Sequence, residues 1–319
     1  MTLPLEGLVG IVTGAGHGIG EAHARALAAA GAAVVVNDAG VGWSGKEDNA
    51  TRAHDVVESI REAGGRATAH VGDVGSADGA RTLVDTALNE FGAVNILVCN
   101  AGITRLGRTD TLREADFDAV HHVHVKGTFL PTRSVVRHWR DRSALGEQVY
   151  GRIITTTSGA ALHMTENMTS VAYASAKAAI LGFSLTLAGE LLDLGVTVNC
   201  LSPGALTHGA ESKPEWMRDP VELARQEPER VSPIAVYLAS PDAADITGAL
   251  FGARSGEFSL YEGYRVIASA SRDEVWPVAD VATWVEEVVG RRYRPPALED
   301  VGSPEATGGR RPAPTSDHS

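Results

Sequence analysis

The sequence predicts an α/β fold, a doubly wound seven-stranded parallel sheet with helices on both faces. Short β-branched runs alternate with longer helical segments between residues 8 and 252. A glycine-rich turn at residues 14–20 follows the first of these runs, and Asp38 ends the second. Alternation of this kind gives parallel strands joined by crossover helices, and ligands then bind beyond the carboxyl ends of the strands.

Composition narrows the class of protein. The chain has 319 residues, of which 44% are hydrophobic, so it can build a sizeable core. The net charge of −12 gives no electrostatic case for binding nucleic acid or an anionic membrane. The two cysteines, Cys99 and Cys200, are expected to be buried free thiols in a reducing compartment. The N-terminus has neither a basic segment nor a long apolar run, so we expect a cytoplasmic protein without a signal peptide or membrane span.

The first strand–turn–helix–strand unit predicts a dinucleotide site. Glycines let backbone N–H groups approach a pyrophosphate, which sits at the positive end of the following helix. A carboxylate at Asp38 can accept hydrogen bonds from the adenosine ribose. The spacing is not G-x-G-x-x-G but T-G-x-x-x-G-x-G, at Thr13, Gly14, Gly18 and Gly20. The alternative is a glycine turn that binds no ligand.

The rest of the chain repeats this alternation. Strands are expected at 66–71, 95–99, 150–157, 196–200 and 249–252, and helices at 53–63, 80–91, 114–139, 171–192 and 232–239. Asp73 follows a strand and can accept from an adenine amino group, although it can also cap the next helix, a role open to Ser76 or Asp78. Three histidines at 121, 122 and 124 suggest a metal site, but neighbouring helical positions do not face one another and no thiolate or carboxylate cluster accompanies them.

Segments outside the alternating pattern have separate interpretations. Residues 39–49 form a long loop that either covers the adenosine or is a solvated insertion, and residues 206–228 are expected to be a mobile substrate lid. We expect one domain at 1–256, with an extension at 257–290 that carries an amphipathic helix at 278–289. Residues 291–319, rich in Pro, Gly and charge, are expected to be disordered.

Tyr173 and Lys177 form the candidate catalytic pair. They stand four positions apart on a helix, so both side chains reach one cleft. A free tyrosine has a pKa near 10, and an ammonium group about 4 Å away can stabilise the phenolate by several kcal/mol. Ser158, at a strand end, can hydrogen-bond a substrate oxygen. The alternative for such a pair is an exposed Tyr and Lys on a helix surface.

These motifs, in this order, resemble the short-chain dehydrogenase/reductase family, with its Rossmann-type fold, over residues 6–252. The Val35-Val36-Asn37-Asp38 and Val123–Phe129 runs are similar to the (3R)-hydroxyacyl-CoA dehydrogenase part of peroxisomal multifunctional enzymes and to bacterial steroid-catabolic relatives. The resemblance implies Ser158, Tyr173, Lys177 and His124 as catalytic residues. The cofactor residues it implies are Gly14, Gly16, His17, Gly18, Ile19, Asp38, Asp73, Val74, Asn100, Ala101, Gly102, Tyr173, Lys177, Pro203, Gly204 and Thr207.

Two positions depart from the family pattern. The family usually has an Asn that orders a proton-relay water where this chain has His124, and a histidine can also hold a water. The interval from Ser158 to Tyr173 is two residues longer than usual, so the loop 163–169 is expected to bulge towards the substrate.

The predicted function is an NAD-dependent oxidoreductase that interconverts a secondary alcohol and a ketone, on a bulky hydroxyacyl thioester, steroid or alicyclic alcohol. Asp38 would repel the 2′-phosphate of NADP, and the glycine turn offers only His17 to receive one. The alternatives are a biosynthetic ketoreductase that uses the same site in reverse, and a non-catalytic nucleotide-binding scaffold. We expect no metal and no nucleic-acid partner, and the resemblance implies a homodimer or homotetramer.

Overall fold

The computed structural model describes residues 3–41, 51–162, 164–165, 170–205, 227–254, 256–263, 268–273, 275–291 and 298–299. Several sequence predictions lie outside these residues: most of the loop 39–49, nearly all of the lid 206–228 with Thr207, and most of the tail 291–319. Of the loop 163–169, the structure describes only a two-residue strand, β6 (Met164–Thr165), which pairs in parallel with β10 (Leu298–Glu299).

An eight-stranded sheet forms the centre of the molecule, in the order β3-β2-β1-β4-β5-β7-β8-β9. Its strands are β1 (Val9–Val12), β2 (Ala33–Asp38), β3 (Arg66–Val71), β4 (Ile96–Cys99), β5 (Arg152–Thr156), β7 (Thr197–Gly204), β8 (Leu250–Arg254) and β9 (Glu257–Tyr261). The predicted α/β class with seven parallel strands is confirmed. The sequence did not indicate β9, which pairs antiparallel to β8 at the edge of the sheet.

The sheet reverses its winding between β1 and β4. Strands β2 and β3 extend it on one side of β1, and β4, β5, β7 and β8 extend it on the other. The connections therefore leave in opposite directions at this point and open a crevice beyond the carboxyl ends of β1 and β4. The crevice positions the candidate site.

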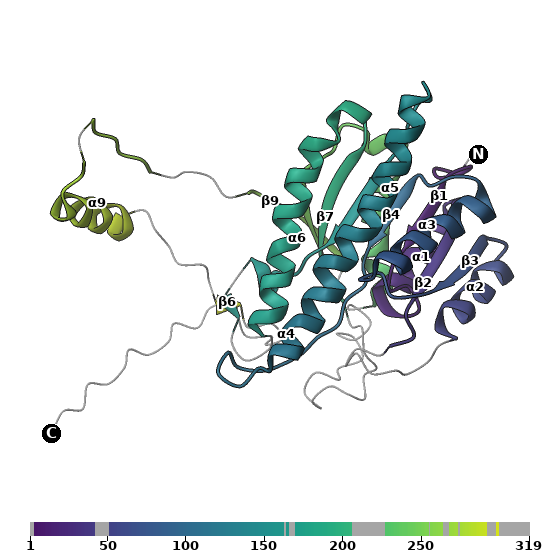
Figure 1. The fold of residues 1–319 in the computed structure, drawn as a ribbon, viewed down its shortest axis with the longest axis horizontal. Coiled ribbons are helices and arrows are strands. Elements are labelled where there is room, and N and C mark those ends of the chain that lie inside the picture. The colour runs from purple at the N-terminus through teal and green to yellow at the C-terminus, as the bar shows by residue number, and fades with distance from the viewer. Residues whose placement is uncertain are drawn as a thin grey trace.

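Helices cover both faces of the sheet, as Figure 1 shows. The described helices are α1 (Gly18–Ala29), α2 (Arg52–Glu62), α3 (Ala77–Phe91), α4 (Glu114–His121), α5 (Gly127–Ala144), α6 (Val171–Glu190), α8 (Ser232–Ala239) and α9 (Val278–Arg291), of which α9 does not lie on the sheet. Short 3₁₀ turns lie at Gly159–Ala161, Leu192–Leu194, Pro228–Arg230 and Pro241–Ala243. One buried apolar cluster joins α1, α2 and α8 to the sheet, and a second joins α3, α5 and α6 to its other face.

The prediction of one continuous helix at 114–139 is wrong. A π-helical turn, η1 (His122–Lys126), divides this segment between α4 and α5. Helices α5 and α6 run side by side (Figure 1), whereas the predicted C-terminal helix, found as α9, stands apart from the sheet.

By length and composition alone α6 could span a membrane, with a mean hydropathy of 1.4. Its buried residues, among them Ala172, Ala176 and Ile180, instead belong to the face that packs within the domain.

Burial of His23 predicts acid sensitivity. The side chain lies between α1 and α8, its Nδ1 is 3.0 Å from the Ser232 hydroxyl, and burial lowers its pKa to about 4. Between pH 6.5 and 4 the unfolded chain therefore binds a proton that the folded chain excludes, so stability falls as pH falls through that window. We expect the free energy of unfolding to fall between pH 7 and pH 5 in both proteins, and to fall by about 2 kcal/mol less in His23→Gln than in the wild type. Urea unfolding at the two pH values measures this difference. Equal losses in both proteins would contradict this assignment.

Candidate active site

Glycines shape the turn between β1 and α1. Gly14 and Gly18 have φ values of 60° and 58°, in the left-handed region that side chains rarely adopt. A Cβ at Gly20 would lie 2.2 Å from the Gly14 carbonyl oxygen, and one at Gly14 would lie 2.7 Å from Cα of Ala101. Backbone therefore passes close to backbone here, and the N–H groups at the start of α1 stay accessible, as an anion site requires.

A hydrogen-bond clamp joins this turn to the end of β4. The buried Thr13 hydroxyl accepts from the backbone N–H groups of Asn100 and Ala101, at 3.0 and 3.1 Å. The Asn100 side-chain amide donates to the carbonyl oxygens of Thr13 and Gly14, both at 3.1 Å. The Asn-Ala-Gly turn at residues 100–102 thus holds the glycine turn in place.

Asp38 lies at the end of β2 with its carboxylate already oriented. Its Oδ2 accepts from the Gly16 N–H at 3.0 Å and its Oδ1 from the Gly40 N–H at 2.8 Å. A Cβ at Gly16 would stand 2.7 Å from Oδ2, so this contact requires glycine. A carboxylate has about four acceptor positions, and two of them remain for further donors such as ribose hydroxyls.

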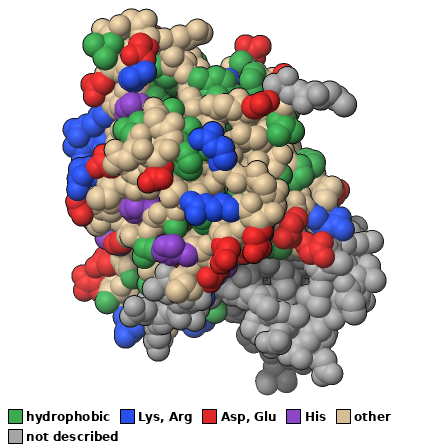
Figure 2. Space-filling view, turned by 90° about the vertical axis from the view of Figure 1, so that its right-hand side faces the viewer, with side chains coloured by type: hydrophobic (Ala, Val, Ile, Leu, Met, Phe, Trp, Pro, Cys, Tyr) green, Lys and Arg blue, Asp and Glu red, His purple; other side chains and the backbone are tan. Residues whose placement is uncertain are grey.

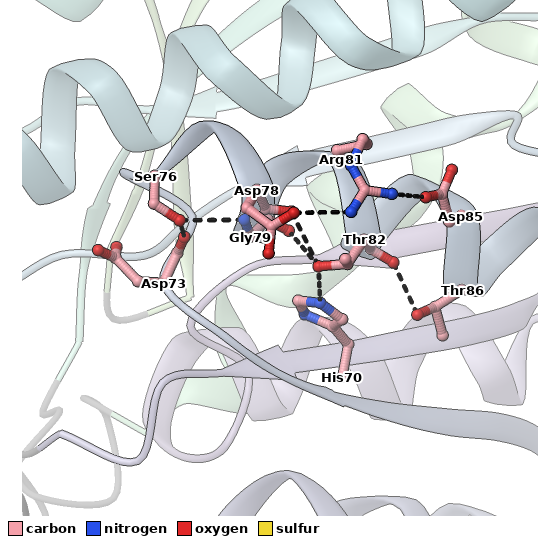
Figure 3. A network of polar contacts seen from close by, with 9 residues as sticks. All are labelled: His70, Asp73, Ser76, Asp78, Gly79, Arg81, Thr82, Asp85 and Thr86. Atoms are coloured by element: carbon pink, nitrogen blue, oxygen red, sulfur yellow. Dashed lines mark hydrogen bonds and ion pairs between the residues drawn. The ribbon is translucent and has the colours of Figure 1, made fainter.

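Asp73 does not cap α3. Ser76 does so by accepting from the Gly79 N–H at 3.0 Å, one of the two alternatives that the sequence left open. Figure 3 shows the Ser76 side chain directed at Gly79 at the start of α3, and the His70 imidazole directed at Thr82. His70 Nε2 lies 3.0 Å from the Thr82 hydroxyl. The Asp73 carboxylate instead accepts from the Gly75 N–H and from His122, and it borders the cavity described below.

The helix α6 brings Tyr173 and Lys177 to the opposite wall of the crevice. The Lys177 ammonium donates to the Thr156 carbonyl oxygen at 2.8 Å and lies 5.7 Å from the centre of the Tyr173 ring. Burial lowers the pKa of Lys177 to about 8, so the amine is still largely charged at neutral pH. The Ser158 hydroxyl lies near the Tyr173 phenol and acts to lower its pKa.

The expected low pKa of Tyr173 is not found in this structure. Burial raises the pKa of the phenol above its usual value, and the nearby Ser158 hydroxyl only partly opposes the shift. The physical reason is that burial disfavours the phenolate while the Lys177 ammonium is directed at the Thr156 carbonyl. A lowered phenol pKa therefore requires a further positive charge in the crevice.

His124 is buried beside Tyr173. Its ring stands perpendicular to the tyrosine ring with the centres 5.3 Å apart, and Nε2 lies 2.8 Å from the carbonyl oxygen and 3.2 Å from the amide nitrogen of Ile103. Burial and the charge of Lys177 lower its pKa to about 3, so the imidazole is neutral. Nδ1 is buried and has no partner within the described part of the chain.

The three neighbouring histidines do not share a ligand. His121 contacts the Phe117 carbonyl and the Ser175 hydroxyl, His122 contacts Asp73, and His124 contacts Ile103. Among the described residues no group of three or more His, Cys, Asp or Glu side chains is arranged to hold a metal ion.

A cavity of about 540 Å³ brings most of the predicted site together. Its lining includes, of the predicted residues, Gly14, His17, Gly18, Ile19, Asp38, Asp73, Val74, Asn100, Ala101, Gly102, His124, Tyr173, Lys177 and Pro203. The other three predicted residues that the structure describes lie next to this lining: Gly16 contacts Asp38, Ser158 lies near Tyr173, and Gly204 follows Pro203 on β7. A cavity of this volume over a glycine turn can accommodate a dinucleotide, and His17 Nε2 is a buried polar atom without a partner in the described residues.

Sequence reasoning missed several lining residues, notably Asn37, Arg105, His122 and Val123. Asn37 precedes Asp38 and accepts weakly from the Gly14 N–H, at 3.4 Å. Its position at the end of β2 was a usable signal, because the carboxyl ends of parallel strands face the ligand. Arg105, His122 and Val123 had no such signal, since loop geometry and the π-helical turn direct them.

Charge on the visible face of the molecule is mixed. In Figure 2 acidic and basic side chains are interspersed, without a continuous basic area. That nucleic acid is not a partner stays a prediction from the net charge.

Residues 9–217 match the model of the short chain dehydrogenase family. This chain belongs to that family. This chain is 37% identical to a hydroxyacyl-CoA dehydrogenase of Mycobacterium tuberculosis over 263 residues, which are 78% of each of the two chains. It is 38% identical to a 3-oxoacyl-[acyl-carrier-protein] reductase of Synechocystis, over 79% of this chain and 97% of the reductase.

Two further similarities extend beyond the matched domain. The chain is 34% identical to mouse peroxisomal multifunctional enzyme type 2 over 88% of its own length, but it spans only 36% of that enzyme. A crystal structure of a short chain dehydrogenase from Mycobacterium avium has a TM-score of 0.81 and 39% identity, and covers 92% of this chain and 98% of its own. The resemblance to the short-chain dehydrogenase/reductase family is therefore confirmed, as is the branch named from the sequence.

The clamp at Thr13 gives a stability prediction for this dehydrogenase. Thr13→Val keeps the shape but leaves two backbone N–H groups without an acceptor, which costs about 1–3 kcal/mol for each buried group. We expect the free energy of unfolding to fall by about 2–4 kcal/mol, measured in urea. Thr13→Ser, which retains the hydroxyl, is the control and should lose less than half as much. A similar loss in both variants would show that the methyl group, and not the clamp, matters.

Proposed function

We propose that the protein is an NAD-dependent dehydrogenase that interconverts a secondary alcohol and a ketone. The observation that carries this proposal is the position of Tyr173, near Ser158 and beside Lys177, on the wall of a cavity that the glycine turn and Asp38 also line. One cavity thus joins an acid/base group to a dinucleotide site. A non-catalytic scaffold has no need of this juxtaposition.

The residues at the nucleotide end suit a dinucleotide. The start of α1, with its glycine turn, would hold the pyrophosphate, and Asp38 would hold the adenosine ribose. Asp73 and Val74 would lie at the adenine, and Asn100, Ala101, Gly102, Pro203 and Gly204 along the remainder; Thr207 lies outside the described residues. Bound NAD would supply a hydride acceptor and a positively charged ring.

Tyr173 would move the proton. In the oxidising direction its phenolate oxygen takes the proton of the substrate hydroxyl, and in the reducing direction the phenol returns it. Ser158 would donate to the substrate oxygen and hold it against the phenol. Lys177 would stabilise the phenolate and contact ribose hydroxyls. Because burial alone raises the pKa of Tyr173, these positive charges are essential at neutral pH.

His124 would serve the proton path without changing its own charge. Its Nε2 contacts the Ile103 backbone, so Nδ1 is the ring nitrogen that stays available to hold a water near Lys177. A pKa of about 3 excludes the imidazolium at working pH. His124 would therefore order a water, as the usual Asn does, and would not act as a titrating base.

The substrate class follows from the relatives and stays a proposal. The similarity to a hydroxyacyl-CoA dehydrogenase and to a peroxisomal multifunctional enzyme supports a bulky hydroxyacyl thioester, and a steroid or alicyclic alcohol fits the same site. The similarity to a 3-oxoacyl-[acyl-carrier-protein] reductase supports the second candidate, a ketoreductase that runs the same chemistry in reverse. Initial rates with NAD and alcohols against NADH and ketones separate the two directions.

Exposed apolar surface supports a homodimer or homotetramer. Phe129 on α5 and Leu185 on α6 are 45% and 61% exposed, and Gly182 and Gly189 leave open space beside them. Two adjacent helices of this kind offer a close packing surface for a second copy. A cytoplasmic location likewise stays a prediction from the sequence.

The role of Tyr173 has a direct test. We expect Tyr173→Phe to reduce turnover by about 10²- to 10⁴-fold, while the Kd for NAD, measured by protein fluorescence, stays within about twofold because the ring remains. The assay follows the absorbance of reduced nicotinamide with hydroxyacyl-CoA, steroid and terpenoid alcohols. Tyr237→Phe, on the exposed face of α8, is the matched control and should retain full activity. Undiminished turnover in Tyr173→Phe would overturn the proposed mechanism.

Asp38 should determine the choice of cofactor. Its carboxylate repels a 2′-phosphate and accepts from a 2′-hydroxyl, and interactions of this kind are each worth about 1–3 kcal/mol. We expect NAD to bind at least about tenfold more tightly than NADP in a fluorescence titration. Asp38→Asn, which removes the charge, should reduce this preference. Tighter binding of NADP by the wild type would refute the cofactor assignment.

A further inference from the structure

The side chains of His122 and Asp73 meet at the nucleotide end of the cavity. His122 Nε2 donates to Asp73 Oδ2 at 2.7 Å, and Asp73 Oδ1 accepts from the Gly75 N–H at 2.8 Å. Both residues line the cavity. The carboxylate is thus held at both oxygens, by a turn of its own segment and by a side chain from a distant one.

The absence of a side chain at Gly75 leaves room for the His122 imidazole at this contact. A Cβ at Gly75 would lie 2.5 Å from His122 Nε2 and 2.8 Å from the His122 carbonyl oxygen, so any side chain there would displace the histidine. His122 is also the first residue of the π-helical turn, a local geometry that often occurs at functional sites. Its neighbour His121 is directed elsewhere, to Phe117 and Ser175.

The contact is poorly placed to stabilise the fold. The two side chains are 38% and 48% exposed, and exposed pairs of this kind contribute little to folding. The two side chains nevertheless meet beside the cavity, at a distance of 2.7 Å. A carboxylate with two acceptor positions occupied still has about two available, and a carboxylate fixed before binding loses less conformational entropy when it accepts a ligand donor.

We infer that His122 is a positioning residue, which fixes the Asp73 carboxylate so that it accepts a hydrogen bond from the exocyclic amino group of adenine. The inference rests on the proposed NAD-dependent function and deepens it. His122 does not contact the reacting atoms, and it acts on the nucleotide only through Asp73. Its effect is therefore confined to nucleotides that carry an amino group at this position.

The test compares NAD with nicotinamide hypoxanthine dinucleotide, in which a carbonyl oxygen replaces that amino group. Dissociation constants for both are measured by fluorescence titration at pH 7 in the wild type, His122→Leu and His122→Gln. The matched control is His121→Leu, an adjacent histidine that does not touch Asp73. Thermal unfolding of each variant checks that the fold is kept.

We expect the wild type to bind NAD more tightly than the hypoxanthine dinucleotide. His122→Leu should weaken NAD binding by about 3- to 10-fold, leave hypoxanthine dinucleotide binding unchanged and keep kcat. His122→Gln, whose amide can still donate to Asp73, should restore part of the preference, and His121→Leu should retain all of it.

Two results would overturn the inference while leaving the proposed function intact. In one, the wild type binds NAD but His122→Leu weakens both dinucleotides equally, which indicates a purely structural role. In the other, His122→Leu changes neither affinity. If the wild type binds no nicotinamide dinucleotide, the proposed function itself fails and the inference fails with it.

Discussion

The hydrogen bonds between the ends of β1 and β4 are the constraint on which the rest of the site depends. The Thr13 hydroxyl and the Asn100 amide tie two neighbouring strands together at the point where the sheet reverses its winding. This connection holds the Gly14 backbone against Ala101, where no Cβ would fit. The glycine turn, the start of α1 and the floor of the cavity therefore share one rigid frame.

Burial disfavours the charged forms of the side chains at the catalytic end of the cavity. It raises the pKa of Tyr173 and lowers the pKa values of Lys177 and His124, so each group is driven towards its neutral form. Proton transfer at neutral pH needs an ionisable phenol, and the positive ring of a bound nucleotide is the charge that such a site lacks. In the proposed mechanism, nucleotide binding thus precedes and enables the proton step, because the same cavity that holds the ring contains the phenol.

Much of this arrangement could be predicted from residue order. The β-branched runs, the glycine spacing and the Asn-Ala-Gly turn are local signals, and parallel strands place their carboxyl ends at one edge of the sheet. Tyr173 and Lys177 follow from helical periodicity. Residues outside such patterns could not be found in this way. Arg105 and Val123 line the cavity only because the loop after β4 and the turn after α4 direct them there.

The sequence by itself determined the α/β class, the seven parallel strands and the identity of the groups that face one another across the crevice, because these depend on short-range periodicity and on a topology with one favoured handedness. Only the tertiary structure decided where the helix at 114–139 changes to a π-helical turn, that β9 extends the sheet antiparallel to β8, and that His122 holds Asp73. It also decided the direction in which burial moves the pKa of Tyr173. Each of these outcomes depends on contacts between segments far apart in the chain, and no local pattern encodes them.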